Sequence, residues 1–105
     1  METPNLNYIE SLADGDLVFK EKLIRIIKFE FPQEQTYYLQ AIKAKNFRAA
    51  AEVVHKLKNK ISMFGLEQCY SLALVHEEEL KINRNEQQAS FELVLNCISN
   101  YLKDI

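Results

Sequence analysis

The 105-residue chain contains very little glycine and proline, two residues of each, and no tryptophan. Strands of an all-β protein are joined by frequent turns that need glycine, proline or asparagine, so this scarcity argues against an all-β fold. The long stretches between the few helix-breaking residues are typical of helices instead. The sequence therefore predicts an all-α fold.

Charge balance and cysteine content exclude several further classes of protein. Thirteen Lys and Arg against fifteen Asp and Glu give a net charge of −2, which argues against binding nucleic acid by phosphate neutralisation. The two cysteines, Cys69 and Cys97, form no spacing typical of a zinc site or a thioredoxin-type redox site. No apolar run approaches the roughly 18 residues of a membrane span, and segment 1–10 lacks the pattern of a signal peptide. We therefore expect a cytoplasmic protein that binds no nucleic acid, membrane or metal.

Length and composition fit a single domain over residues 1–105. Hydrophobic residues at 48% and charged residues at 27% are ordinary for a globular protein, which argues against disorder. Residues that break or cap helices divide the sequence into six expected helices, over about 5–13, 17–30, 33–43, 46–65, 66–83 and 85–102.

Particular residues set the expected helix boundaries. Asp16 and Asn46 are good caps for the helices that follow them, and Asn85 with Gln88 resembles a capping box. Pro32 is expected to separate the second helix from the third, because the residue before a proline avoids helical angles. Loops this short make successive helices pack antiparallel, so we expect an antiparallel up-and-down four-helix bundle with a short additional N-terminal helix or helices.

The helix expected over 46–65 has one apolar face along its whole length. Apolar residues recur there at alternating spacings of three and four: Phe47, Ala50, Val54, Leu57, Ile61 and Phe64. At about 100° per residue, His55 points roughly 130° away from the centre of this face. We therefore expect the His55 imidazole to be exposed to solvent or to a partner.

The residues around His55 suit a phosphoryl acceptor. Imidazole itself is mostly neutral and nucleophilic at pH 7, and a cation one helical turn away can neutralise an arriving phosphate. The neighbours on the same face are Arg48, Ala51, Glu52, Lys58, Asn59 and Ser62, with Lys56 and Lys60 further round. Geometry alone leaves a second interpretation open, in which His55 is an ordinary solvated histidine among surface lysines.

The order of residues around His55 resembles the signature of histidine-containing phosphotransfer (HPt) domains. That signature has leucine and lysine two and three residues after the histidine and a glycine near the tenth, matched here by Leu57, Lys58 and Gly65. Segments 7–9, 15–23 and 41–47 also follow the family's order, so the resemblance covers nearly the whole chain. The family usually has glycine four residues after the histidine, where this chain has Asn59, a small residue that narrows access for a partner.

The resemblance implies a phosphoryl carrier rather than an enzyme. His55 would accept a phosphoryl group from the aspartate of a receiver domain, supplied by a hybrid sensor histidine kinase, and pass it to another receiver. The receiver provides the acidic pocket and Mg²⁺, so this chain needs no cofactor of its own, and we expect it to be a monomer. Residues expected to stabilise the phosphate or dock the partner are Lys58, Asn59, Ser62, Arg48 and Ala51.

Two positions beyond the helix of His55 also enter the hypothesis. The resemblance makes His76 or Glu77 a candidate for orienting the His55 ring, whereas the residues alone favour a partly buried His76 and a solvated 77–79 face. A metal site formed by His55, His76 and Glu77 would need three converging ligands and is not expected. The competing function is a helical-bundle adaptor that docks a signalling partner through the same face without phosphotransfer.

Overall fold

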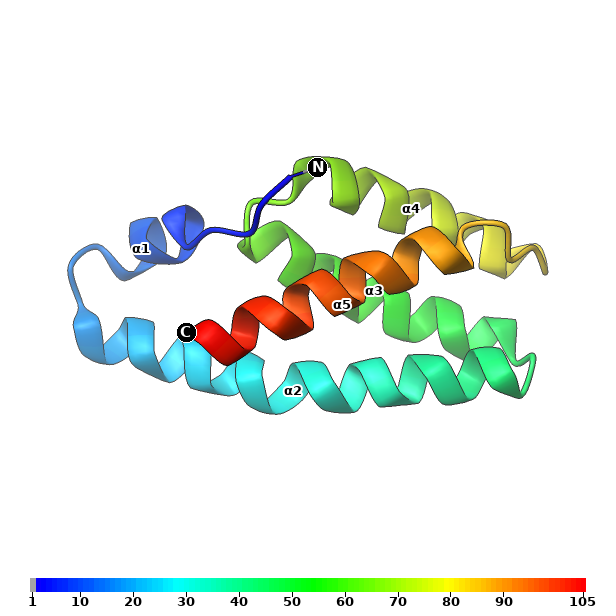
Figure 1. The fold of residues 1–105 in the computed structure, drawn as a ribbon, viewed down its shortest axis with the longest axis horizontal. Helices are drawn as coiled ribbons and strands as arrows, with labels where there is room; N and C mark the ends of the chain where they lie inside the picture. The colour runs from blue at the N-terminus through cyan, green and yellow to red at the C-terminus, as the bar shows by residue number, and fades with distance from the viewer. Residues whose placement is uncertain (1) are drawn as a thin grey trace.

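The computed structural model describes residues 2–105, which is the whole of the predicted domain 1–105 except Met1. The described residues form five α-helices and no strand, so the all-α prediction is confirmed. None of these helices is both long and apolar enough to cross a membrane. The helices are α1 (Asn7–Ala13), α2 (Leu17–Lys43), α3 (Phe47–Met63), α4 (Glu67–Lys81) and α5 (Gln88–Asp104) (Figure 1).

Two predicted caps are confirmed. The Asp16 carboxylate accepts a hydrogen bond from the backbone N–H of Phe19 at 3.0 Å, at the start of α2. The Asn46 side chain accepts one from the backbone N–H of Ala49 at 3.1 Å, at the start of α3. Each cap satisfies a backbone donor that has no partner within its own helix.

The predicted capping box at the start of α5 is wrong. Residues 86 and 87 form a turn, and α5 begins only at Gln88, with no side-chain cap. The Asn85 amide donates to the Gln88 side chain, so these two groups bond each other instead of the backbone N–H groups of the helix.

The predicted break at Pro32 is also wrong, because α2 continues through it from Leu17 to Lys43. A proline inside a helix usually costs about 3 kcal/mol, since it lacks a donor and crowds the preceding turn. Here both halves of α2 bury side chains in the same core, and each such burial contributes roughly 1.5–3 kcal/mol, which outweighs the cost. These side chains are Ile27, Phe31, Tyr38, Ala41 and Ile42.

The four longer helices surround one apolar core. Helix α3 packs between α2 and α4, while α5 packs against α4 and α2, and α1 lies on the first part of α2 (Figure 1). The predicted apolar face of α3 is confirmed, because Ala50, Val54, Leu57, Ile61 and Phe64 are all completely buried and Phe47 is partly buried. Only a strip of α3 between α2 and α4 therefore reaches the surface.

The N-terminal segment holds the start of α4 in place. The Glu2 carboxylate accepts hydrogen bonds from the backbone N–H groups of Gln68 at 2.8 Å and Cys69 at 3.0 Å. Asn5 lies against Gly65, which has a positive φ of 73°, and a Cβ at this position would lie 2.7 Å from the Asn5 amide, so the Asn5 side chain would have to move. Both the backbone conformation and this close approach favour glycine at the turn between α3 and α4.

Both cysteines are free and partly buried. Burial, followed by the Glu2 carboxylate, raises the pKa of the Cys69 thiol to about 11. The thiol is therefore protonated and poorly nucleophilic at neutral pH.

Candidate functional site

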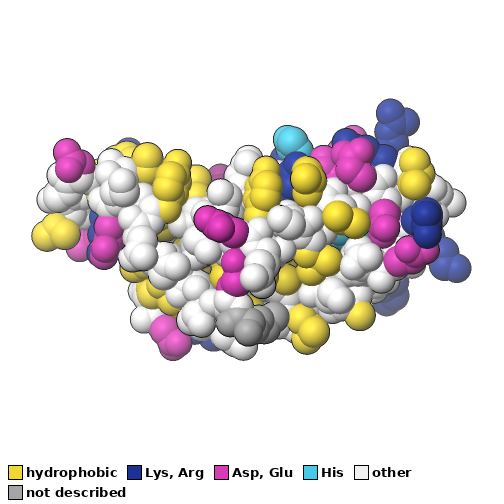
Figure 2. All heavy atoms as spheres, turned by 90° about the horizontal axis from the view of Figure 1, so that it is seen from above, with side chains coloured by type: hydrophobic (Ala, Val, Ile, Leu, Met, Phe, Trp, Pro, Cys, Tyr) yellow, Lys and Arg dark blue, Asp and Glu magenta, His cyan; other side chains and the backbone are white. Residues whose placement is uncertain are grey.

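His55 lies near the middle of α3, on the strip between α2 and α4. Its side chain is 64% exposed, as the spacing of the apolar residues predicts. In Figure 2 a histidine projects from the surface beside acidic, basic and hydrophobic side chains. The rest of α3 fixes its position, because Val54 and Leu57 on either side are completely buried.

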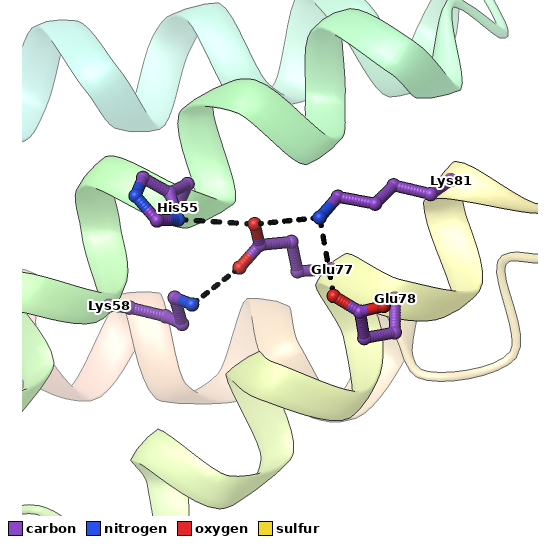
Figure 3. A network of polar contacts seen from close by, with 5 residues as sticks. All are labelled: His55, Lys58, Glu77, Glu78 and Lys81. Carbon is purple, nitrogen blue, oxygen red and sulfur yellow. Dashed lines mark hydrogen bonds and ion pairs between the residues drawn. The ribbon is translucent and has the colours of Figure 1, made fainter.

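A buried carboxylate on α4 joins His55 to two lysines (Figure 3). The Glu77 Oε2 atom is 3.1 Å from His55 Nδ1, and Glu77 Oε1 is 2.6 Å from Lys58 Nζ. Lys81 Nζ lies 3.5 Å from Glu77 Oε2 and 3.2 Å from the Glu78 carboxylate. Glu77 therefore lies at the centre of a network that links α3 to α4.

The charges around Glu77 determine its protonation state. Burial by itself raises the pKa of the Glu77 carboxyl, but the hydrogen bond and charge of Lys58, with the charges of His55 and Lys81, lower it overall. Glu77 is thus ionised at neutral pH and can only accept hydrogen bonds.

This protonation state fixes the tautomer of His55. Because Glu77 accepts, His55 Nδ1 must carry a proton, and in the neutral ring the lone pair is then on Nε2. Among residues 2–105, no hydrogen-bond partner lies at Nε2. The arrangement presents a nucleophilic nitrogen to solvent on a ring held from its other side.

An open hollow of about 750 Å³ lies beside His55 between α3 and α4. Arg48 is exposed at its edge, whereas Ala51 is buried and lines it with its short side chain. Asn59 and Ser62 are both exposed, further along α3 on the side of its C-terminus. These predicted docking residues lie within two helical turns of His55, and the hollow is also lined by Glu52, Lys56, Glu77 and Lys81.

The prediction of a surface-lying Lys58 is wrong. Its side chain is only 10% exposed, its ammonium group is paired with Glu77, and it lies 5.9 Å from the centre of the Tyr70 ring. Helix α4 covers this side of α3, and the sequence of α3 alone contains no sign of that contact. Lys58 therefore supports Glu77 in the described structure and is not free for a phosphate.

The structure separates the two candidates for orienting His55. Glu77 contacts the His55 ring, whereas His76 points into the core, where its Nε2 lies 2.7 Å from the Tyr38 hydroxyl. Burial lowers the pKa of His76 to about 4, so His76 is neutral at pH 7. Direct orientation of His55 by His76 is thus a wrong expectation, as is a fully solvated 77–79 face, since Glu77 is buried.

Sequence reasoning missed two members of this region. Lys81 follows Glu77 by four residues, a spacing that places both on one side of a helix, so the pattern could have identified it. Tyr38 had no such signal, because its contact with His76 joins α2 to α4. Within residues 2–105, no group of three or more His, Cys, Asp or Glu side chains is arranged to hold a metal ion.

Comparisons with known proteins found no match to this chain among protein-family models, curated proteins or solved structures.

Proposed function

We propose that this chain is a histidine phosphotransfer domain, an antiparallel four-helix bundle of α2 to α5 with α1 as the additional N-terminal helix. His55 accepts a phosphoryl group from the aspartate of a receiver domain and passes it to another receiver. The protein acts as a cytoplasmic monomer, and a hybrid sensor kinase supplies the phosphate. The observation that supports this function is the exposed His55 whose Nδ1 is bound to the ionised Glu77.

The proposed chemistry follows from this tautomer. The Nε2 lone pair attacks the phosphorus atom of an aspartyl phosphate, and the N–P bond forms as the P–O bond to the aspartate breaks. The electron pair of that bond returns to the receiver carboxylate. The ring keeps its proton on Nδ1 and becomes positively charged, and the Glu77 carboxylate, 3.1 Å away, offsets this charge. The second transfer reverses these steps toward another aspartate.

The surroundings of His55 suit an acidic partner. The hollow beside the ring is lined by three basic side chains, Arg48, Lys56 and Lys81, against the two carboxylates of Glu52 and Glu77. Glu77 is buried against Lys58, and Lys81 is paired with Glu78. The remaining charges of the lining, Arg48 and Lys56 against Glu52, make the accessible surface positive. A receiver domain contributes an acidic pocket and its Mg²⁺, and opposite charges favour its approach.

Phosphorylation of the purified chain tests this proposal. The protein is incubated with an autophosphorylating hybrid kinase and its receiver, and the phosphoryl group is located by intact mass and peptide mapping. We expect one phosphoryl group, labile in acid, on the peptide that contains His55. The His55→Gln variant should remain folded by circular dichroism and acquire none.

The other histidine serves as an internal control. His76 is completely buried, so a phosphoryl group on its peptide would contradict the proposal. A chain that binds the receiver without ever becoming phosphorylated would be the adaptor of the competing interpretation. That outcome would also overturn the proposed function.

A further inference from the structure

A second polar contact lies inside the core, formed by His76, the residue that precedes Glu77 on α4. The Tyr38 hydroxyl of α2 is 2.7 Å from His76 Nε2 of α4, and both residues are completely buried. The Tyr38 ring forms T-shaped pairs with the rings of His76 and of Phe91 on α5, with ring centres 5.8 Å and 5.2 Å apart. This cluster of Tyr38, His76 and Phe91 joins three helices.

Packing alone does not account for a histidine in this cluster. The Nδ1 atom of His76 is buried and has no hydrogen-bond partner among residues 2–105. An apolar side chain would fill the same space without leaving a polar atom unpaired. What the histidine adds is a directional bond to Tyr38, which an apolar residue cannot form.

His76 and Glu77 are neighbours on α4, and their side chains point about 100° apart around the helix axis. One therefore reaches α2 and the other reaches α3. A rotation of α4 about its axis that moved His76 would move the Glu77 carboxylate by a similar angle. Whatever fixes the rotation of α4 also fixes the contact between Glu77 and His55.

We propose that Tyr38 is a positioning residue for His55. Its hydrogen bond to His76 fixes the rotation of α4 and thereby holds the Glu77 carboxylate against His55 Nδ1. The effect on the rate of phosphoryl transfer rests on the proposed function. The effect on the His55 tautomer does not, since it concerns the unphosphorylated chain.

The test measures which nitrogen of His55 carries the proton. Long-range ¹H–¹⁵N spectra of the full chain, at a pH where the ring is neutral, distinguish the Nδ1–H tautomer from the Nε2–H tautomer. The variant is Tyr38→Phe, and the matched control is Tyr37→Phe, the same change at the adjacent, exposed tyrosine. A Glu77→Leu/Lys58→Met double variant, which leaves no unpaired charge, supplies the reference spectrum of His55 without its carboxylate.

We expect the Nδ1–H tautomer to predominate in the unmodified chain and in Tyr37→Phe. In Tyr38→Phe its population should shift toward that of the double variant. Lower stability by itself would not move this signal in the folded state. An unchanged tautomer in a folded Tyr38→Phe protein would overturn the inference.

A second pair of variants covers the case in which Tyr38→Phe does not fold. The amide of His76→Gln can still bond the Tyr38 hydroxyl, whereas His76→Leu cannot. We expect the Gln variant to keep the Nδ1–H tautomer and the Leu variant to lose it. Equal tautomer populations in these two proteins would contradict the role of Tyr38.

Transfer rates separate this inference from the proposed function. If His55 is the acceptor, Tyr38→Phe should be phosphorylated about three- to tenfold more slowly than Tyr37→Phe, the effect of weakening one hydrogen bond. An unmodified chain that is never phosphorylated overturns the proposed function, and the tautomer spectra still decide the role of Tyr38. If both tyrosine variants are phosphorylated at the rate of the unmodified chain, the positioning role of Tyr38 is contradicted and the proposed function is not.

Discussion

At the scale of single residues, Lys58 shows how one contact changes a role. Three residues after His55, it has the spacing of a phosphate-binding cation, yet its ammonium group is buried against Glu77. A buried carboxylate that loses its partner is costly, because the low-dielectric interior does not solvate the remaining charge. The structure therefore assigns Lys58 a part in stability that its spacing does not suggest.

Replacing Lys58 should destabilise the fold. We expect Lys58→Ala to lower the free energy of unfolding by about 1–3 kcal/mol, because it leaves the buried Glu77 carboxylate with only the exposed Lys81 and His55 side chains as partners. Urea unfolding followed by circular dichroism measures the change. Lys81→Ala is the control and should cost about 0–1 kcal/mol, as exposed pairs do. Equal decreases in the free energy of unfolding for the two variants would show that the buried Lys58–Glu77 pair stabilises the fold no more than an exposed pair does.

His76 should make stability depend on pH. Its pKa falls from 6.5 in the unfolded chain to about 4 in the folded protein, because burial disfavours the charged ring. The unfolded state therefore binds a proton more readily, and the stability contributed by the neutral ring is present above pH 6.5 and lost as pH falls toward 4. We expect the free energy of unfolding to drop by roughly 3 kcal/mol across this window.

The comparison that isolates this effect is His76→Phe, which cannot titrate. The unfolded and folded pKa values of His76 set the range to be compared, from pH 6.5 to pH 4. Over this range the unfolding free energy of His76→Phe should change less than that of the unmodified chain. Parallel pH profiles for the two proteins would mean that His76 titrates alike in both states.

At the scale of helices, the continuity of α2 results from packing. Proline lowers the helix propensity at position 32, but the side chains that precede and follow it contact one core, and that burial is larger than the local penalty. Helix propensity predicts a break at any proline within the sequence. It does not take into account the side chains that both halves of a helix bury in one core.

The cost of Pro32 can be measured. Pro32→Ala restores a backbone donor within α2 and removes the crowding of the preceding turn, so it should raise the free energy of unfolding by about 1–3 kcal/mol. Thermal and urea unfolding give this value directly. A variant less stable than the unmodified chain would contradict this expectation and show that the restriction of the unfolded chain by proline outweighs its cost in the helix.

At the scale of the whole molecule, contacts between distant segments place the site. The start of α4 is capped by Glu2, a residue more than 60 positions earlier in the sequence. Glu77, further along α4, contacts His55. Glu2 thus replaces the local side-chain cap that α4 lacks.

Removing this distant cap should weaken the fold. Glu2→Ala leaves two backbone N–H groups at the start of α4 without their acceptor, and we expect a loss of about 0.5–2 kcal/mol. The measurement is the urea midpoint, with Thr3→Ala, a change at the neighbouring exposed residue, as the control. An unaltered midpoint in Glu2→Ala would show that water satisfies these donors equally well.

The sequence by itself determined the helical class, the caps at Asp16 and Asn46, the buried face of α3 and the exposure of His55. Each of these depends on residues within a few positions of one another, where helix geometry fixes the directions of side chains. Only the tertiary structure decided that Lys58 is buried, that Glu77 and not His76 contacts His55, and that α2 passes through Pro32. These outcomes depend on which helices are neighbours and on how each helix is rotated about its axis. Burial and charge pairing between distant segments then outweigh the helix propensities of individual residues.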